Sequence, residues 1–161
     1  MAIRTIREIG DPLLNNISKE VTSMTLRTHR LIEDMLETMY TVGGVGLAAP
    51  QVGILKRIVV IDVTEDASEP IILINPQIIF QEGEQTGNEG CLSVPGKVGV
   101  VTRPDHVIVR ALNEKMEEIE VEGFDLMARA MCHELDHLDG HLYTELVEGP
   151  LMDVERPEEE E

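Results

Sequence analysis

The decisive stretch of the sequence is Cys132-His133-Glu134-Leu135-Asp136-His137-Leu138-Asp139-Gly140, which holds the pattern His-Glu-x-x-His and closes on a glycine. On an α-helix His133 and His137 are one turn apart, so both imidazoles leave the same face. Two neutral imidazoles at that spacing can hold one metal ion, and Glu134 can reach a water on that ion. The alternative is a polar helix face with two surface histidines. The apolar flanks are typical of a buried helix and favour the metal site.

Length and composition indicate one globular domain. The chain has 161 residues, enough for a hydrophobic core, and 42% of them are hydrophobic, which excludes a disordered chain. The longest apolar runs, such as Ile58 to Ile61 and Ile71 to Ile74, are too short to cross a bilayer. The N-terminus has no continuous apolar segment of the kind found in signal peptides. We therefore expect a cytoplasmic protein that makes no membrane contact.

The charge of the chain limits its partners. The formal net charge is −18, from 13 basic and 31 acidic residues. This acid excess argues against direct nucleic-acid binding, which needs basic patches that neutralise phosphates. Part of the excess lies in the run from Glu155 to Glu161. We expect a single domain over residues 1–147 and an acidic, flexible tail over residues 148–161.

Hydrophobic periodicity predicts two long helices separated by strands. Apolar residues at helical spacing predict a helix from about residue 25 to the glycines at 43–44, and a second one over residues 124–138 that ends at Gly140. We expect a polar loop over residues 82–90 and a bend or sheet edge at Pro76. Strands are expected over residues 57–63, 71–75, 77–81, 98–101, 106–112 and 117–122, and a short strand or helical turn over residues 143–147.

Two histidines do not complete a catalytic metal site, which usually has three protein ligands and one open position. The metzincin pattern fails, because Tyr143 occupies the place of its third histidine. A gluzincin would need a glutamate on a later helix, and Glu145 and Glu148 lie on no convincing helix. The remaining strong candidate is Cys91, on a glycine-flanked segment upstream. In a reducing cytoplasm Cys91 and Cys132 are expected to be a metal ligand or buried thiols rather than a disulfide.

Three segments together resemble the signature motifs of the peptide deformylase family, in the same order and at similar spacing. They are Gly44-Val45-Gly46-Leu47-Ala48-Ala49-Pro50-Gln51, Glu89-Gly90-Cys91-Leu92-Ser93 and His133-Glu134-Leu135-Asp136-His137-Leu138-Asp139-Gly140. The resemblance covers residues 1 to 147. It implies an α+β fold in which antiparallel sheets surround the metal-bearing helix. It also implies a hydrolase that removes the formyl group from N-formylmethionyl peptides of nascent bacterial-type proteins and releases formate.

The resemblance implies the metal ligands as well. Cys91, His133 and His137 would bind one divalent ion, with Fe(II) the natural ion and zinc or nickel able to replace it. A thiolate and two imidazoles leave such a site with a charge of +1, which still lowers the pKa of a bound water toward neutrality.

By the same resemblance, further residues take part in the reaction. Glu134 would take a proton from the attacking water and pass it to the leaving amine. The side-chain amide of Gln51 and the backbone N–H of Leu92 would stabilise the oxyanion. The backbone around Val45 and Gly46 would pair with the extended peptide as an added strand. The side chains of Val45, Leu126 and Ala130 are candidates to line the pocket of the methionine side chain, although core packing explains Leu126 and Ala130 equally well.

The sequence departs from the family pattern in three places. Cys132 stands where many members have Gln before the first histidine, and its position on the helix points away from the ligand face, so we expect it in the core. Gly96-Lys97-Val98 occupies the region where some relatives carry a substrate-binding Arg. The acidic tail argues against ribosome docking through a basic C-terminal helix, so only transient proximity to the ribosome is expected. Whether Glu89 and Asp136 orient a neighbouring residue or are solvated charges stays open.

A helix with the His-Glu-x-x-His pattern is also compatible with two other functions. A zincin-like metallopeptidase would cleave internal peptide bonds, but the third ligand that it needs downstream is missing. A structural or regulatory metal-binding protein would prefer a closed shell of four ligands. The presence of Glu134 and Gln51 argues against the second function, because a structural site needs neither an acid–base group nor an oxyanion donor.

Overall fold

Eight strands and two α-helices make up the fold within residues 2–154, the part of the chain that the structure, a computed structural model, describes. The helices are α1 (Leu26–Thr41) and α2 (Leu126–Leu138). The strands are β1 (Gly46–Ala48), β2 (Ile58–Ile61), β3 (Ile71–Glu82), β4 (Gln85–Cys91), β5 (Val94–Arg103), β6 (His106–Leu112), β7 (Glu118–Phe124) and β8 (Met152–Asp153). Short 3-10 helices cover Pro12–Asn15, Ala49–Val52 and Tyr143–Glu145.

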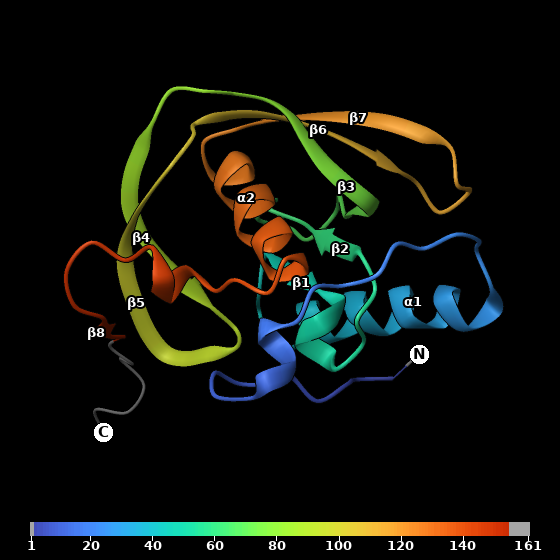
Figure 1. The fold of residues 1–161 in the computed structure, drawn as a ribbon, viewed down its shortest axis with the longest axis horizontal. Coiled ribbons are helices and arrows are strands. Elements are labelled where there is room, and N and C mark those ends of the chain that lie inside the picture. The colour runs from blue at the N-terminus through green and yellow to red at the C-terminus, as the bar shows by residue number, and fades with distance from the viewer. Residues whose placement is uncertain (1, 155–161) are drawn as a thin grey trace.

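The strands form two antiparallel sheets. The larger sheet has the order β1-β2-β3-β6-β7, and the smaller has the order β4-β5-β8. Figure 1 shows α2 between the two sheets, with the β4–β5 hairpin on one side and the strands of the larger sheet on the other. The predicted α+β fold, with antiparallel sheets around a central helix, is confirmed.

The strand β2 is buried over its whole length because a helix covers each of its faces. Ile58 and Val60 pack in the core cluster that contains the apolar face of α1. Val59 and Ile61 point the other way and pack in the cluster that contains α2. Alternate residues of a strand face opposite sides of the sheet. The continuous apolar run of β2 therefore packs against α1 on one face and against α2 on the other, which fixes the distance between the two helices.

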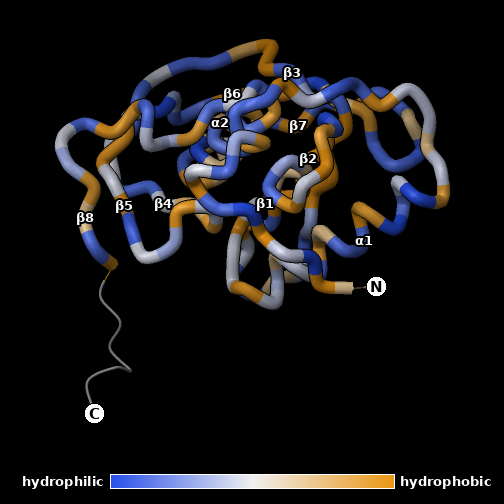
Figure 2. Tube along the Cα trace, turned by 60° about the horizontal axis from the view of Figure 1, so that its bottom comes forward, coloured by the Kyte–Doolittle hydropathy of each residue, from blue (hydrophilic) through white to orange (hydrophobic). Residues whose placement is uncertain are grey.

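Helix α1 is amphipathic and begins at an N-cap. The side chain of Thr25 accepts a hydrogen bond from the backbone N–H of Thr28 at 3.1 Å, which satisfies one of the free donors of the first turn. Figure 2 shows hydrophobic and hydrophilic residues alternating along its coils. The predicted helices over residues 25–43 and 124–138 are both confirmed, with their ends shifted by a few residues.

Two local predictions are corrected by the structure. The predicted loop over residues 82–90 is wrong, because Gln85–Cys91 forms β4 and pairs along β5. The polar composition of β4 is tolerated because it is an edge strand of the smaller sheet, with several side chains exposed. The two strands expected around Pro76 are one strand, β3, whose register shifts between Ile74 and Gln77. Proline lacks the N–H that a regular ladder requires, which accounts for the irregularity.

The division into a domain over residues 1–147 and a tail over residues 148–161 stays a prediction. Residues 155–161 of that predicted tail lie outside the described residues. Within the described part, Met152–Asp153 forms β8 and pairs with Lys97 and Val98 of β5. In residues 2–154 we find no helix with both the length and the apolar character needed to span a membrane.

The glycine that ends α2 generates a prediction about stability. Gly140 has a φ of +83°, and a Cβ at this position would lie 2.5 Å from the backbone oxygen of Asn15. Gly43, which follows α1, has a similar φ of +75° but open space around it. We expect Gly43→Ala to lower the free energy of unfolding by about 1 kcal/mol, through backbone strain alone. Gly140→Ala should cost at least about 2 kcal/mol, because the backbone of Asn15 must also move.

Urea unfolding of the two variants and of the unmodified protein measures the difference. If the two variants lost equal amounts of unfolding free energy, the close approach of Gly140 to the backbone of Asn15 would not add to the cost of the substitution.

Candidate metal centre

Cys91, His133 and His137 meet at one point although they come from two distant segments. One ligand atom from each lies within 4.8 Å of the others, and no other group of this kind occurs among residues 2–154. Cys91 is the last residue of β4, and both histidines project from α2. The Sγ atom of Cys91 lies 3.3 Å from Nε2 of His137, and the two imidazole rings are 5.0 Å apart.

Burial and hydrogen bonds shift the pKa values of the two histidines in opposite directions. Burial and the neighbouring His133 lower the pKa of His137 to about 3, so its imidazole is neutral and keeps a lone pair free for a ligand bond. Burial opposes a charge on His133, but hydrogen bonds with Cys91 and Glu89 raise its pKa well above the usual value. The Sγ atom of Cys91 accepts N–H groups from Ser93 at 3.4 Å and from Gln51 at 3.6 Å, so both donors are directed at the sulfur. The donor set therefore fits a divalent ion.

A buried carboxylate, Glu89, fixes the orientation of His133. Its Oε2 atom accepts a hydrogen bond from Nδ1 of His133 at 2.6 Å. Both oxygens also bind the guanidinium of Arg103, and Oε1 accepts from Arg129 at 2.8 Å. Burial raises the pKa of Glu89, but the hydrogen bonds from His133 and Arg103 outweigh it and hold the pKa at about 2. With Nδ1 engaged, Nε2 of His133 is the nitrogen left for an ion.

These contacts answer the question that the sequence left open. Glu89 orients a predicted ligand and is 5% exposed, so it is not a solvated charge. Asp136 binds the arginine that binds Glu89: its Oδ2 atom accepts a hydrogen bond from Arg103 at 2.8 Å. Sequence reasoning missed Arg103 and Arg129. A signal was present for Arg129, because it lies one turn before His133 on the predicted helix and so on the same face. Arg103 falls between two predicted strands, and local patterns gave no signal for it.

Glu134 is a buried carboxylate with an unused oxygen. It is 4% exposed, it lines the cavity, and its Oε1 atom has no hydrogen-bond partner among residues 2–154. Burial raises the pKa of Glu134 to about 7. A Cβ at Gly46 would lie 2.5 Å from Oε2 of Glu134, so only glycine fits beside it. A buried oxygen without a hydrogen-bond partner lowers the stability of the fold, because it has lost its contacts with water. A water or an ion bound at this place would give the oxygen a partner.

Gln51 is completely buried, and hydrogen bonds hold its amide. Its Oε1 atom accepts from the backbone N–H of Ala48 at 2.9 Å, and its Nε2 atom donates to Oγ of Ser93 at 3.0 Å and faces Sγ of Cys91. The NH₂ group therefore points at the centre. Leu92 follows Cys91 directly and also lines the cavity.

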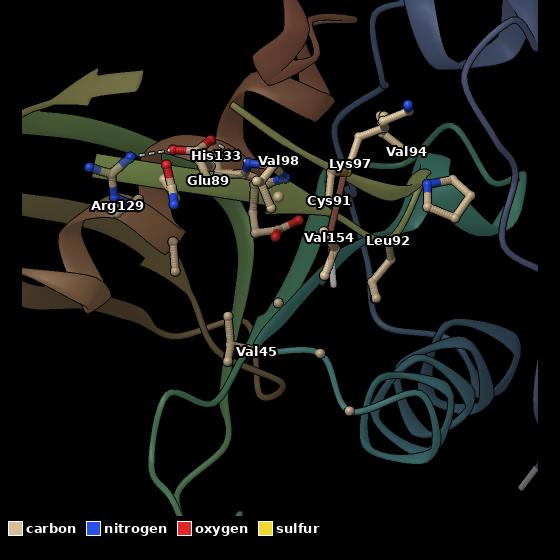
Figure 3. A pocket seen from close by; sticks show the side chains of 18 of the residues that line it. Val45, Glu89, Cys91, Leu92, Val94, Lys97, Val98, Arg129, His133 and Val154 are labelled. Carbon is tan, nitrogen blue, oxygen red and sulfur yellow. Dashed lines mark hydrogen bonds and ion pairs between the residues drawn. The ribbon is translucent and has the colours of Figure 1, made fainter. Parts of the chain in front are cut away.

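One cavity of about 460 Å³ joins these residues (Figure 3). It brings together most of the residues predicted from the sequence: Val45, Gly46, Gln51, Cys91, Leu92, Leu126, Ala130, His133 and Glu134. His137, which is 1% exposed, is not among its lining residues. Lining residues that the sequence did not predict are Gly43, Gly44, Asn88, Glu89, Gly90, Val94, Pro95, Gly96, Lys97, Val98, Arg129 and Val154. Most of the latter belong to the β4–β5 hairpin, whose pairing the sequence did not reveal.

The second cysteine lies apart from the cluster. Cys132 is 6% exposed and packs in the core cluster around α2. Burial raises the pKa of its thiol to about 11, so it stays protonated. The expectation that Cys132 is a core residue is confirmed.

Comparison with known proteins agrees with this geometry. A family model described as "Polypeptide deformylase" matches residues 3–150. The peptide deformylase of Agathobacter rectalis is 65% identical over 154 residues, which cover 96% of each chain. The peptide deformylase of Lachnoclostridium phytofermentans is 60% identical over 161 residues, which cover 100% of this chain and 99% of the relative.

Solved structures show the same fold. A peptide deformylase from Legionella pneumophila superposes with a TM-score of 0.89 at 41% identity, over 91% of this chain and 87% of that one. One from Thermotoga maritima superposes with a TM-score of 0.88 at 38% identity, over 92% of this chain and 100% of that one.

The buried carboxylate of Glu89 generates the second prediction. Glu89→Gln removes the negative charge that Arg103, Arg129 and His133 share. We expect the free energy of unfolding to fall by about 3 kcal/mol, because buried positive charges lose their partner. Metal affinity should fall by about tenfold to a hundredfold, because the imidazole of His133 is no longer oriented. Urea unfolding and titration against a competing chelator measure the two effects.

An exposed carboxylate provides the control. Glu120 pairs with Arg110 at 3.1 Å on the surface, so Glu120→Gln should change the free energy of unfolding by less than about 1 kcal/mol and leave metal affinity unchanged. If Glu89→Gln behaved like Glu120→Gln, the positioning role of Glu89 would be wrong.

Proposed function

Because the chain belongs to the peptide deformylase family, whose members remove the N-formyl group from nascent polypeptides, we propose that the cavity beside Cys91 is where N-formylmethionyl peptides lose this group as formate. The observation that carries the proposal is that a group of metal-ligating atoms and an unpaired carboxylate oxygen occur at the same site. The donor atoms of Cys91, His133 and His137 lie within 4.8 Å of one another. The unpaired oxygen of Glu134 belongs to the same cavity.

The metal is proposed to be one divalent ion held by Cys91, His133 and His137. A sulfur donor with two imidazoles suits Fe(II), Zn(II) or Ni(II) better than Mg(II) or Ca(II), which prefer oxygen ligands. Among the suitable ions we propose Fe(II) as the natural one, with zinc or nickel able to replace it. When bound, the ion supplies Lewis acidity, which polarises the formyl carbonyl and lowers the pKa of a water.

Glu134 is proposed to move the proton. It accepts a proton from the water that attacks the formyl carbon, and it gives this proton to the amine nitrogen as the carbon–nitrogen bond breaks. The products are formate and a free methionine amine. A pKa of about 7 suits both steps, because the group can accept and release a proton near neutral pH.

Two N–H groups are proposed to stabilise the oxyanion. The side-chain NH₂ of Gln51 is held toward the centre by the contacts of its amide with Ala48 and Ser93. The backbone N–H of Leu92, next to the proposed ligand Cys91, would supply the second donor. Donors that are held before the reaction begins cost no reorganisation during it.

The substrate peptide is proposed to bind as an extended strand along β1. Among the described residues, this strand is at the end of the larger sheet and pairs only with β2. Gln51 already accepts the backbone N–H of Ala48, so the peptide is proposed to pair with the strand at Gly46. Val45 and Gly46 both line the cavity, so a peptide paired with them would lie inside it. Leu126 and Ala130, on the first two turns of α2, form an apolar wall of the cavity for the methionine side chain.

An enzyme whose substrates are nascent chains works where proteins are synthesised. We propose that the protein works in the bacterial cytoplasm and comes close to the ribosome only transiently. The two relatives described above are bacterial, which supports this view. A zincin-like peptidase remains the alternative. It would cleave internal peptide bonds, and no downstream ligand supports it within the described residues.

The role of Glu134 generates the third prediction. Glu134→Gln keeps the size of the side chain but removes its ability to accept a proton. We expect formate release from a formyl-Met peptide to fall by about a hundredfold to ten-thousandfold, with metal content unchanged. Metal analysis and a formate assay on the same sample measure both. A variant that kept its activity would show that another group transfers the proton.

The two cysteines generate the fourth prediction, because each serves as a control for the other. Cys91→Ala removes one proposed ligand, and we expect it to lose most of the bound metal. Cys132→Ala changes a core thiol, and we expect it to keep the metal and to lose about 1 kcal/mol of stability. Metal content after anaerobic purification decides between them. Normal metal binding by Cys91→Ala would remove this residue from the proposed ligand set.

A further inference from the structure

The cavity has an apolar wall that the three sequence motifs do not account for. Val154, directly after β8, lines the cavity although the motifs end well before it. Val154, Val45 and Leu126 are 44%, 42% and 49% exposed, and they come from three different elements. Large apolar side chains are usually buried, so three half-exposed ones around one cavity form a rim that a ligand would cover.

The chain around Val154 is held in place by contacts with β5. The register of β8 on β5 pairs Asp153 with Lys97, and the backbone N–H of Val154 donates to the carbonyl of Gly96 at 3.0 Å. Leu151 and Val147 fill the space above Gly99, where a Cβ would lie 2.7 Å from Val147. The position of Val154 at the cavity is therefore set by main-chain hydrogen bonds and packing.

The same wall carries a cation that already has a partner. Lys97 lines the cavity, and its ammonium forms an ion pair with Asp153. Because this pair is partly exposed, it contributes little to stability. It does reduce the attraction of Lys97 for an acidic group of a ligand. This leaves the apolar side chain of Val154 as the feature that a substrate residue would meet here.

The geometry of an extended peptide decides which substrate residue reaches Val154. Successive side chains of a strand point to opposite sides. If the methionine side chain lies against Leu126 and Ala130 on α2, the next side chain points toward the wall formed by β5 and Val154. Figure 3 shows Val154 with Leu92 and Lys97 on one side of the cavity and Arg129 on the other.

We infer that Val154 contacts the side chain that follows N-formylmethionine and gives the enzyme a preference for an apolar residue at that position. This inference rests on the proposed function, because it assumes that the cavity binds formylated peptides along β1. Val154 touches no reacting atom in this scheme and acts as a specificity-determining residue.

The test compares three peptides that differ only in the residue after methionine. Formyl-Met-Leu-amide, formyl-Met-Lys-amide and formyl-Met-Gly-amide are assayed for formate release, and the Gly peptide reports the reaction without a second side chain. We expect Val154→Asp to lower the Leu/Gly ratio of kcat/KM by about fivefold and to raise the Lys/Gly ratio. Val154→Ala should lower the Leu/Gly ratio by a smaller factor and leave the Lys/Gly ratio nearly unchanged.

A neighbouring residue provides the matched control. Met152 lies two residues before Val154, on β8, at similar exposure and is absent from the cavity lining. Met152→Ala should leave both ratios unchanged. The inference is overturned if the Val154 variants change kcat/KM for all three peptides by one common factor or leave both ratios at the original values. If the unmodified, metal-loaded protein released no formate from any of the three peptides, the proposed function itself would be the failure.

Discussion

The carboxylate of Glu89 is the interaction on which the arrangement of the centre depends. It binds Arg103 on β5 and both Arg129 and His133 on α2. Glu89 lies on β4 two residues before Cys91, so the same contacts that hold β4 against the helix also bring the thiol next to His137. A buried charge is tolerated only when it is paired, and here three donors share one carboxylate. This cluster is therefore both a structural clamp between the smaller sheet and α2 and the support of a proposed ligand.

Much of the site could be predicted from the sequence because its reacting groups lie within short motifs. The spacing of His133 and His137 on a helix depends only on the helical repeat. The long helices follow from their apolar periodicity, and β2 follows from its run of β-branched residues. Cys91 was the candidate left after the downstream ligands were excluded, and the family resemblance then implied it as the third ligand.

The parts that were missed depend on contacts between distant residues. The polar residues of Gln85–Cys91 give no strand signal. Strand β4 forms because β5 offers a partner strand that carries Arg103 and because α2 offers Arg129. Arg129 is separated from Glu89 by 40 positions, and Val154 reaches the cavity only because β8 pairs with β5. Local patterns carry no information about such pairings. The open question about Glu89 could be answered only once its burial and its partners were known.

The proposed reaction requires an ion held beside Glu134. The most direct measurement is formate release from a formyl-Met peptide by protein purified without oxygen, before and after its metal is removed and returned, with the metal counted each time. The account predicts about one ion per chain, loss of formate release on removal, and recovery when Fe(II) is added back. Full activity without metal, or a filled site that releases no formate, would contradict it.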